Sequence, residues 1–358
     1  NSGTLNISGD VEVAGTVTIA SGAVLDVDGD FDATGGNVTF SGAGTLQVSS
    51  STTSLGTLTT TAGTVKYDGS SAQTVFAGDY YNLDIDGSGT KSLAGNTTVK
   101  GDITLTDGEL DFDGNRNLNV IGDITKTSGA LVNSSSSNGY LILKATSSQN
   151  ASQALCGFTA PSVSIKVQQS ADVEITGNIS ANYLWVQANN SGTFTIDNDY
   201  TLEVDNYIKV AGGTLNVVTG SLTTTLNSSS GHKLSGGTLD IDGGTVSFGS
   251  SSNSTADLNI DGGTLDISGG TLNVSDCIDI VSGTFTQSGG VVNVKTYETG
   301  DGDDDHKFKM VAGTLNLTGG TMNLLGEKEA DDKYSMQIAA GVTTTSTTSH
   351  TIAVSTND

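Results

Sequence analysis

The sequence lacks most of what builds helices and large globular cores. Among 358 residues there is one proline, and aromatic residues make up only 5% of the chain, whereas glycine occurs 48 times. No segment places apolar residues at i, i+3, i+4 and i+7 over three turns, the pattern of an amphipathic helix. Val, Leu and Ile alternate with polar residues instead, which disordered Gly- and Ser-rich linkers do not require. We therefore expect an ordered, all-β chain without a helix longer than two turns.

Positive charge is also scarce. Arg116 is the single arginine, and 39 acidic residues give the chain a formal net charge of −25. Binding to nucleic acid or to anionic lipid depends on clustered Lys and Arg, so this balance argues against both partners. No apolar run approaches 18 residues, and the chain opens without Met or a signal-like segment. We expect no membrane insertion, and we interpret the chain as a processed product or an excised piece.

Cysteine is nearly absent. Cys156 and Cys277 are too few for a disulfide framework and too far apart in sequence for a zinc knuckle. Buried small apolar residues are the favoured interpretation, while a disulfide between the two stays open. The two cysteines therefore do not indicate the redox compartment.

One phrase recurs along the chain and predicts a turn followed by a strand. It is seen at Gly212–Val217, Gly236–Ile241, Gly262–Ile267, Gly269–Val274 and Ala312–Leu317. Its Leu and its Val or Ile stand two residues apart and so share one face of a strand, while Thr and Asn or Asp take the other face. Apolar side chains are expected to point inward and polar ones outward.

The spacing of this phrase predicts a coil. Gly213 to Gly237 is 24 residues, Gly237 to Gly263 is 26, and Gly263 to Gly313 is 50, which equals two steps of 25. Such a repeat favours a right-handed parallel β-helix (β-solenoid) with coils of roughly 25 residues, each burying its apolar face on its neighbours. We expect one domain over residues 1–358, with a loop-bearing stretch at about 133–176 and an acidic loop at about 296–308.

Two regions resemble known secreted proteins. The segments Gly63–Gly69, Ala77–Leu83 and Gly87–Val99 resemble repeats of very large bacterial surface proteins, and the C-terminal half with its Gly-Gly-Thr-Leu phrases is similar to adhesin and autotransporter passenger regions. The resemblance implies an extracellular or cell-surface β-helix used for attachment, display or matrix building. It carries no catalytic motif.

Catalysis is the weaker alternative. A hydrolase needs two carboxylates across the scissile bond. Pairs such as Asp84 with Asp86, Asp111 with Asp113, and Asp240 with Asp242 share an outward face, but similar pairs occur along the whole chain. Their distribution suits solubility and protection of strand edges better than one tuned site. We expect no enzyme, although polysaccharide degradation and carbohydrate binding remain the alternatives.

Calcium is the possible cofactor. Asp301, Asp303 and Asp305 alternate in an acidic run with Glu298 just upstream, as oxygen-ligand loops require. The run departs from an EF-hand, because His306 stands at its sixth position, and a solvated acidic insertion is the competing interpretation. A second candidate is the run of Asp26, Asp28, Asp30 and Asp32.

The only tryptophan marks a possible glycan platform. Tyr183 and Trp185 lie on the strand face opposite Leu184 and Val186, so both aromatics point outward if the aliphatic pair is core. Exposed aromatic pairs can stack on sugar rings, although they are more often covered by a loop or subunit.

The two ends of the sequence enter and leave the repeat without a polar cap. Gly3, Thr4, Leu5 and Ile7 form the first strand-like run, and Thr351, Ile352 and Val354 belong to the last. Uncapped coils expose unpaired backbone groups and an apolar column, so we expect these residues to mediate head-to-tail self-association, unless flanking coils of a longer protein cover them. The function predicted is that of a non-catalytic structural or adhesive fibre.

Overall fold

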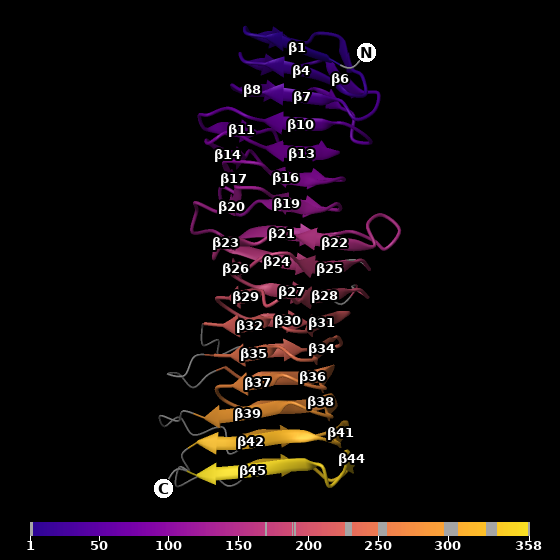
Figure 1. Ribbon diagram of the computed structural model, residues 1–358, viewed down its shortest axis with the longest axis vertical. Coiled ribbons are helices and arrows are strands. Elements are labelled where there is room, and N and C mark those ends of the chain that lie inside the picture. The colour runs from indigo at the N-terminus through magenta and orange to yellow at the C-terminus, as the bar shows by residue number, and fades with distance from the viewer. Residues whose placement is uncertain are drawn as a thin grey trace. The chain divides into compact units, whose positions relative to one another are not determined.

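The computed structural model describes residues 3–168, 170–187, 189, 191–225, 231–249, 256–296, 307–326 and 335–356. These residues form strands and turns, and no helix occurs among them. The strands pair in parallel and stack as the coils of a β-solenoid (Figure 1). The predicted all-β solenoid is therefore confirmed.

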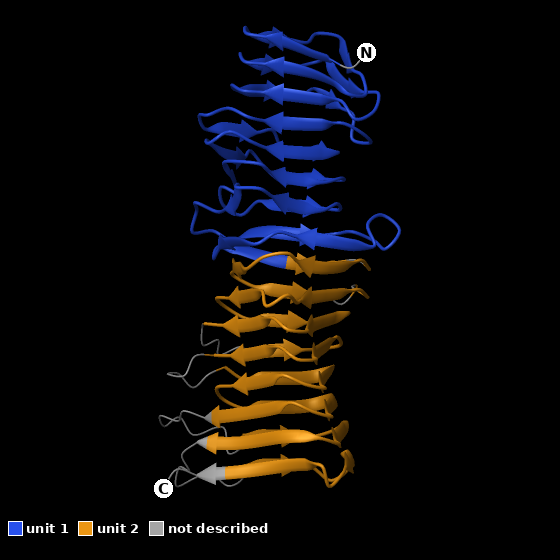
Figure 2. Cartoon of the chain, viewed as in Figure 1, with its two compact units in different colours: residues 1–165 blue, residues 166–358 orange. Residues whose placement is uncertain are grey.

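The described chain divides into two compact units, residues 1–165 (unit 1) and residues 166–358 (unit 2) (Figure 2). The boundary lies inside the stretch 133–176, which the sequence predicts to be irregular. There the interval between paired residues rises to 31, because Ile124 pairs with Leu155, whereas Ile103 pairs with Ile124 at an interval of 21. The extra residues include a turn at residues 147–149. The single-domain organisation stays a prediction.

Unit 1 has three faces, of which one forms an unbroken ladder. This ladder contains β1 (Gly3–Ile7), β4 (Ala23–Val27), β7 (Thr45–Val48), β10 (Thr64–Tyr67), β13 (Asn82–Ile85), β16 (Ile103–Leu105), β19 (Ile124–Lys126) and β22 (Ser152–Leu155). The second face contains β2 (Val11–Glu12), β5 (Phe31–Asp32), β8 (Thr52–Ser54), β11 (Gln73–Val75), β14 (Thr90–Leu93), β17 (Glu109–Asp111), β20 (Ala130–Val132) and β23 (Phe158–Ala160). The third contains β3 (Thr16–Ile19), β6 (Asn37–Phe40), β9 (Thr57–Leu58), β12 (Asp79–Tyr80), β15 (Thr97–Val99), β18 (Asn117–Val120), β21 (Gly139–Leu143) and β24 (Val163–Val167), whose last two residues belong to unit 2.

Unit 2 has the same three-faced plan. One face contains β27 (Leu184–Val186), β30 (Ile208–Val210), β33 (His232–Leu234), β40 (Phe308–Met310), β43 (Met336–Ile338) and the first halves of β36 (Leu258–Ile267) and β38 (Ile278–Gln287). Their second halves continue the face of β25 (Asp172–Ile175), β28 (Thr193–Ile196), β31 (Thr214–Val217), β34 (Thr238–Ile241), β41 (Thr314–Leu317) and β44 (Thr343–Ser346). The third contains β26 (Ile179–Ala181), β29 (Thr201–Val204), β32 (Ser221–Thr224), β35 (Thr245–Phe248), β37 (Thr271–Val274), β39 (Val291–Thr296), β42 (Gly320–Gly326) and β45 (His350–Thr356).

Alternation of polar and apolar residues places the core. In β34 the side chains of Leu239 and Ile241 are fully buried, whereas those of Thr238 and Asp240 are only partly covered. Parallel, in-register pairing repeats this choice from coil to coil, since Leu239 lies against Leu265. Each core position therefore forms a column of apolar side chains, as the repeated phrase predicts.

The predicted coil of roughly 25 residues is correct only for part of unit 2. Paired residues stand 20 apart at Gly3 and Ala23, and 18 apart at Thr64 and Asn82. The 50 residues from Gly263 to Gly313 form two coils of unequal length. Thr284 pairs with Thr264 at a spacing of 20 residues and with Thr314 at a spacing of 30. Coil length varies because insertions at the corners leave the strands in register.

Polar side chains occupy some inward positions at the corners of unit 1. Lys91 is fully buried, and its Nζ donates to the carbonyl oxygens of Gly69 at 2.6 Å and Gly89 at 2.9 Å. Gln73, its register neighbour, donates to the Val48 and Ser50 carbonyls, both at 2.8 Å. These side chains satisfy backbone oxygens that turn inward where the chain changes face.

Candidate functional site

Trp185 stands at the centre of a basic surface in unit 2. Leu184 and Val186 on either side of it are fully buried, and Trp185 is half-buried, so its predicted outward orientation is confirmed. Its ring is not open, however. The Nζ atoms of Lys166 and Lys209 lie 5.7 and 5.1 Å from the ring centroid, in the geometry of cation–π contacts.

Lys166, Trp185, Lys209 and Lys233 form what we call the basic column. Trp185 pairs in register with Lys209, and Lys209 with Lys233, so the outward side chains succeed one another from strand to strand. Beside this column the rings of Tyr183 and Tyr207 pack with their centroids 4.6 Å apart. The sequence analysis identified the aromatic residues and missed the lysines that lie above and below the tryptophan.

Asp240 has the most perturbed carboxyl group of the predicted acidic pairs. Burial, and then the negative charges of Asp242 and Asp266, raise its pKa to about 6. Asp266 is its register partner in the next coil. The sequence analysis therefore identified one acidic neighbour of Asp240, Asp242, and missed Asp266 on the adjacent strand. Asp240 and Asp266 occupy the same position in two copies of the recurring phrase, 26 residues apart, so the repeat itself indicates that they are neighbours.

The other two acidic pairs are engaged in local structure. Lys66 Nζ lies 2.6 Å from a carboxylate oxygen of Asp86 and 3.8 Å from one of Asp84. Asp111 is buried and accepts hydrogen bonds from the backbone N–H and hydroxyl of Ser134 at 3.0 and 2.6 Å. Asp113 contributes to an ion pair with Arg116. Ion pairing and hydrogen bonding account for these carboxylates.

The predicted calcium ligands fall into two groups. Glu298, Asp301, Asp303 and Asp305 lie outside the described residues, so the acidic loop stays a prediction. The second candidate, the run from Asp26 to Asp32, does not gather into a metal-ligating cluster in the described chain. Asp30 accepts from the Ser50 hydroxyl at 2.7 Å, and Asp32 accepts from the Thr34 hydroxyl at 2.6 Å. These two carboxylates therefore stabilise turns.

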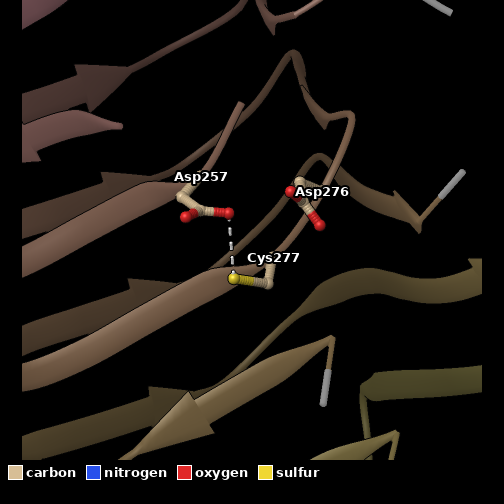
Figure 3. A group of neighbouring side chains, drawn as sticks. All are labelled: Asp257, Asp276 and Cys277. Atoms are coloured by element: carbon tan, nitrogen blue, oxygen red, sulfur yellow. Dashed lines mark hydrogen bonds between the residues drawn. The ribbon is translucent and has the colours of Figure 1, made fainter. Parts of the chain in front are cut away.

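Metal-ligating atoms do converge at one place in the described part of unit 2. The side chains of Asp257, Asp276 and Cys277 are neighbours (Figure 3), and their ligand atoms all lie within 4.8 Å of one another. Asp276 and Cys277 are buried, and the Cys277 thiol donates to Asp257 Oδ1 at 3.2 Å. Two carboxylates and a thiolate could hold a divalent transition metal, but the thiol's hydrogen bond also accounts for the arrangement without an ion.

Neither cysteine forms a disulfide, and both are buried. Burial raises the pKa of the Cys156 thiol to about 11, which keeps it protonated and unreactive at neutral pH. His232 is buried too, and desolvation lowers its pKa to about 4. Its ring stacks on Phe248 with centroids 4.4 Å apart, and Nδ1 accepts from the Ile208 N–H. These residues pack the core.

The predicted self-association residues lie on strands with one open edge. Within the described residues, β1 pairs only with β4, and β45 pairs only with β42. Leu5 is 61% exposed, although its register partner Leu25 is 7% exposed. Ile352 and Val354 are 41% and 57% exposed, whereas their partners Met322 and Leu324 are fully buried. Gly3, Thr4 and Thr351 are also exposed, and Ile7 is partly covered. Core positions are thus uncovered on both strands.

No protein-family model, no curated protein and no solved structure matches this chain. Among the described residues no helix is long and apolar enough to cross a membrane. The basic column and the two open strands are therefore interpreted from their own geometry.

Proposed function

We propose that this chain is a non-catalytic, extracellular structural or adhesive element that assembles end to end into fibres. The observation that supports this proposal is the exposure of core side chains on β1 and β45. Full burial of a Leu, Ile or Val side chain contributes about 1.5–3 kcal/mol, so these strands gain stability when covered. A second copy of the chain offers a matching surface, because each end has parallel strands and apolar columns.

The direction of stacking also supports end-to-end growth. β1 is open on the side away from β4, and β45 is open on the side away from β42. Successive coils of a β-solenoid pair in parallel, so the last coil of one copy can pair in the same way with the first coil of another. Such a heterologous contact leaves the next pair of ends open and forms a filament.

Assembly is tested by electron microscopy and sedimentation of the purified chain over a range of concentrations. Leu5→Asp and Val354→Asp place a charge on core positions and should abolish filaments. Thr4→Asp and Ala353→Asp add the same charge at neighbouring positions of the same strands and should retain them. Monomers at every concentration would contradict self-assembly and favour coverage of these strands by flanking coils of a longer protein.

An extracellular or cell-surface location is part of the same proposal, as is calcium binding by the acidic run. The resemblance to secreted bacterial repeat regions supports the location. Chelator titration, followed by the melting temperature, tests calcium: stabilisation by added Ca²⁺ that Asp303→Asn removes supports a bound ion, and unchanged melting contradicts it.

Polysaccharide cleavage is the second candidate, and the raised pKa of Asp240 is the observation that favours it. A general acid works best with a pKa near the working pH. Incubation with a panel of acidic and neutral polysaccharides tests this alternative. Turnover that Asp240→Asn abolishes would replace the non-catalytic proposal.

A further inference from the structure

The basic column is exceptional in a chain of this charge. Its three lysines and Trp185 lie on four neighbouring strands of a protein with 14 Lys and Arg residues and 39 acidic residues. The nearest described outward positions are Gln168, Tyr183, Gln187, Tyr207, Ala211 and Ser235. None of them is acidic. In the following coil, a carboxylate oxygen of Asp261 lies 3.4 Å from Lys233 Nζ. The surface is therefore a local positive patch with aromatic neighbours.

We propose that the basic column binds an acidic polysaccharide, with Lys166, Lys209 and Lys233 contacting its carboxylate or sulfate groups. Attraction between the patch and an anionic sugar chain follows from charge complementarity. The inference does not depend on end-to-end assembly, because all of these residues lie within unit 2.

Lys209 remains available for a ligand. Among the described residues Lys209 forms no ion pair with a carboxylate, and its recorded contact is with the Trp185 ring. Burial removes hydration from the Lys166 ammonium and so lowers its pKa. The Trp185 indole N–H is buried without a hydrogen-bond partner and can donate to a sugar oxygen as the lysines shift.

The covered ring disfavours a neutral glycan. A neutral sugar would bind by stacking on an open aromatic face, but Lys166 comes from the coil before Trp185 and Lys209 from the coil after it. Stacking would have to displace both ammonium groups from the ring. An anionic sugar can instead bind to the ammonium groups themselves, so its charge determines which ligand binds.

The size of the patch favours a glycan over nucleic acid. Three strand spacings separate Lys166 from Lys233, roughly 14 Å at 4.7–4.9 Å for each. Duplex DNA carries about one charge per 1.7 Å along its axis, so it would extend far beyond the patch, over a surface of a protein with net charge −25. An acidic polysaccharide has more widely spaced charges and can contact the patch with a few sugar units.

Trp185 is the only tryptophan and therefore reports binding by its fluorescence. The whole chain is titrated with polygalacturonate, dextran sulfate, uncharged dextran and an oligothymidylate. The test variant is Lys166→Gln/Lys209→Gln. Lys309→Gln is the matched control, because Lys309 lies on the same face and pairs with Asp279, away from the tryptophan. Lys166→Arg/Lys209→Arg retains the charge and controls for folding.

We expect polygalacturonate or dextran sulfate to change the fluorescence, with an affinity that falls as salt rises. The double Gln variant should bind roughly tenfold more weakly, and the Lys309→Gln and double Arg variants should bind within about twofold of the parent. Equal binding of dextran, no response to either anionic glycan, equal losses in the Lys309 control, or tighter binding of oligothymidylate would each overturn the proposal.

Discussion

At the scale of single residues, the neighbours of a side chain include residues about one coil away. Burial and the charge of Asp242 raise the pKa of Asp240, and Asp266 adds to the shift because it repeats the position of Asp240 in the next coil. Lys209 contacts Trp185 for the same reason. Chemistry in this fold is therefore determined by register along the stack as well as by spacing within a strand.

Asp240→Asn is expected to stabilise the protein at pH 7.5. The pKa of Asp240 is raised to about 6 from 3.8, so the folded state holds its proton more tightly than the unfolded state, and stability falls as pH rises between these values. Removing the charge should gain on the order of 1 kcal/mol, after allowance for solvent screening. Melting temperatures at pH 7.5 and 3.5 measure this effect, and the gain should vanish at the lower pH.

Asp197→Asn is the matched control for that measurement. Hydrogen bonding from the Thr219 hydroxyl, at 2.7 Å, lowers the pKa of Asp197. Its ionised form is therefore favoured in the folded state, and the substitution should give no stabilisation at pH 7.5. A similar gain in both variants would show that the general negative charge, and not the cross-coil pair, causes the effect.

Lys91→Met should be strongly destabilising although it replaces a charge by an apolar side chain of similar length. The buried ammonium donates to the carbonyl oxygens of Gly69 and Gly89, which would lose that donor. Buried unsatisfied acceptors cost about 1–3 kcal/mol each, so the expected loss for the two carbonyls is about 2–6 kcal/mol. Urea unfolding followed by circular dichroism measures it.

Lys233→Met provides the surface comparison. The side chain of Lys233 is 43% exposed and forms one ion pair with Asp261, at 3.4 Å. Exposed pairs contribute less than about 1 kcal/mol. Comparable losses at the two lysines would contradict the structural role assigned to Lys91.

At the scale of strands and corners, glycines determine how closely the coils can approach. Gly290 has a φ of 63°, and a Cβ there would lie 2.4 Å from the carbonyl oxygen of Gly269. Gly262 has a φ of 93°, yet its Cβ would meet nothing within 4 Å. Alanine at Gly262 would therefore cause backbone strain alone, whereas alanine at Gly290 would cause the same strain and a clash with the neighbouring coil.

Gly290→Ala should therefore destabilise unit 2 more than Gly262→Ala. The left-handed conformation costs an alanine roughly 1–2 kcal/mol at either position, and Gly290→Ala also requires the neighbouring backbone to move. The difference in melting temperature between the two variants measures the additional cost. Equal losses would mean that the coils separate without penalty.

The recurring phrase was sufficient to predict strands, faces and parallel stacking. It did not predict coil length, because residues inserted at the corners leave the alternation of apolar residues in the strands unchanged. Thr284 and Thr314 are 30 residues apart, and Thr264 and Thr284 only 20. The basic column was missed although the sequence contains its signal, since Trp185, Lys209 and Lys233 follow one another at the 24-residue step of Gly213 to Gly237. Conversely, no feature of the sequence indicates whether the Trp185 ring is covered by neighbouring side chains or open to solvent.

At the scale of the whole molecule, charge is expected to oppose the proposed end-to-end assembly. Each chain has a net charge of −25, so two copies repel one another at a distance. The apolar positions Leu5, Ile352 and Val354 attract only when strands meet. End-to-end association should therefore be limited by long-range repulsion and stabilised by short-range burial.

Added salt is expected to promote filament formation. Raising the ionic strength from about 0.01 M to 0.15 M shortens the Debye length from about 30 Å to about 8 Å, which screens the repulsion while apolar contacts persist. Light scattering at fixed protein concentration should therefore increase with NaCl, and it should increase again as the pH approaches the pI of about 4.1, where the net charge vanishes. Leu5→Asp should scatter as a monomer over the range of salt concentrations, since its interface is lost. Filaments that dissolve as salt is added would show that ionic contacts hold the ends together, and that the uncovered core positions on β1 and β45 do not drive assembly.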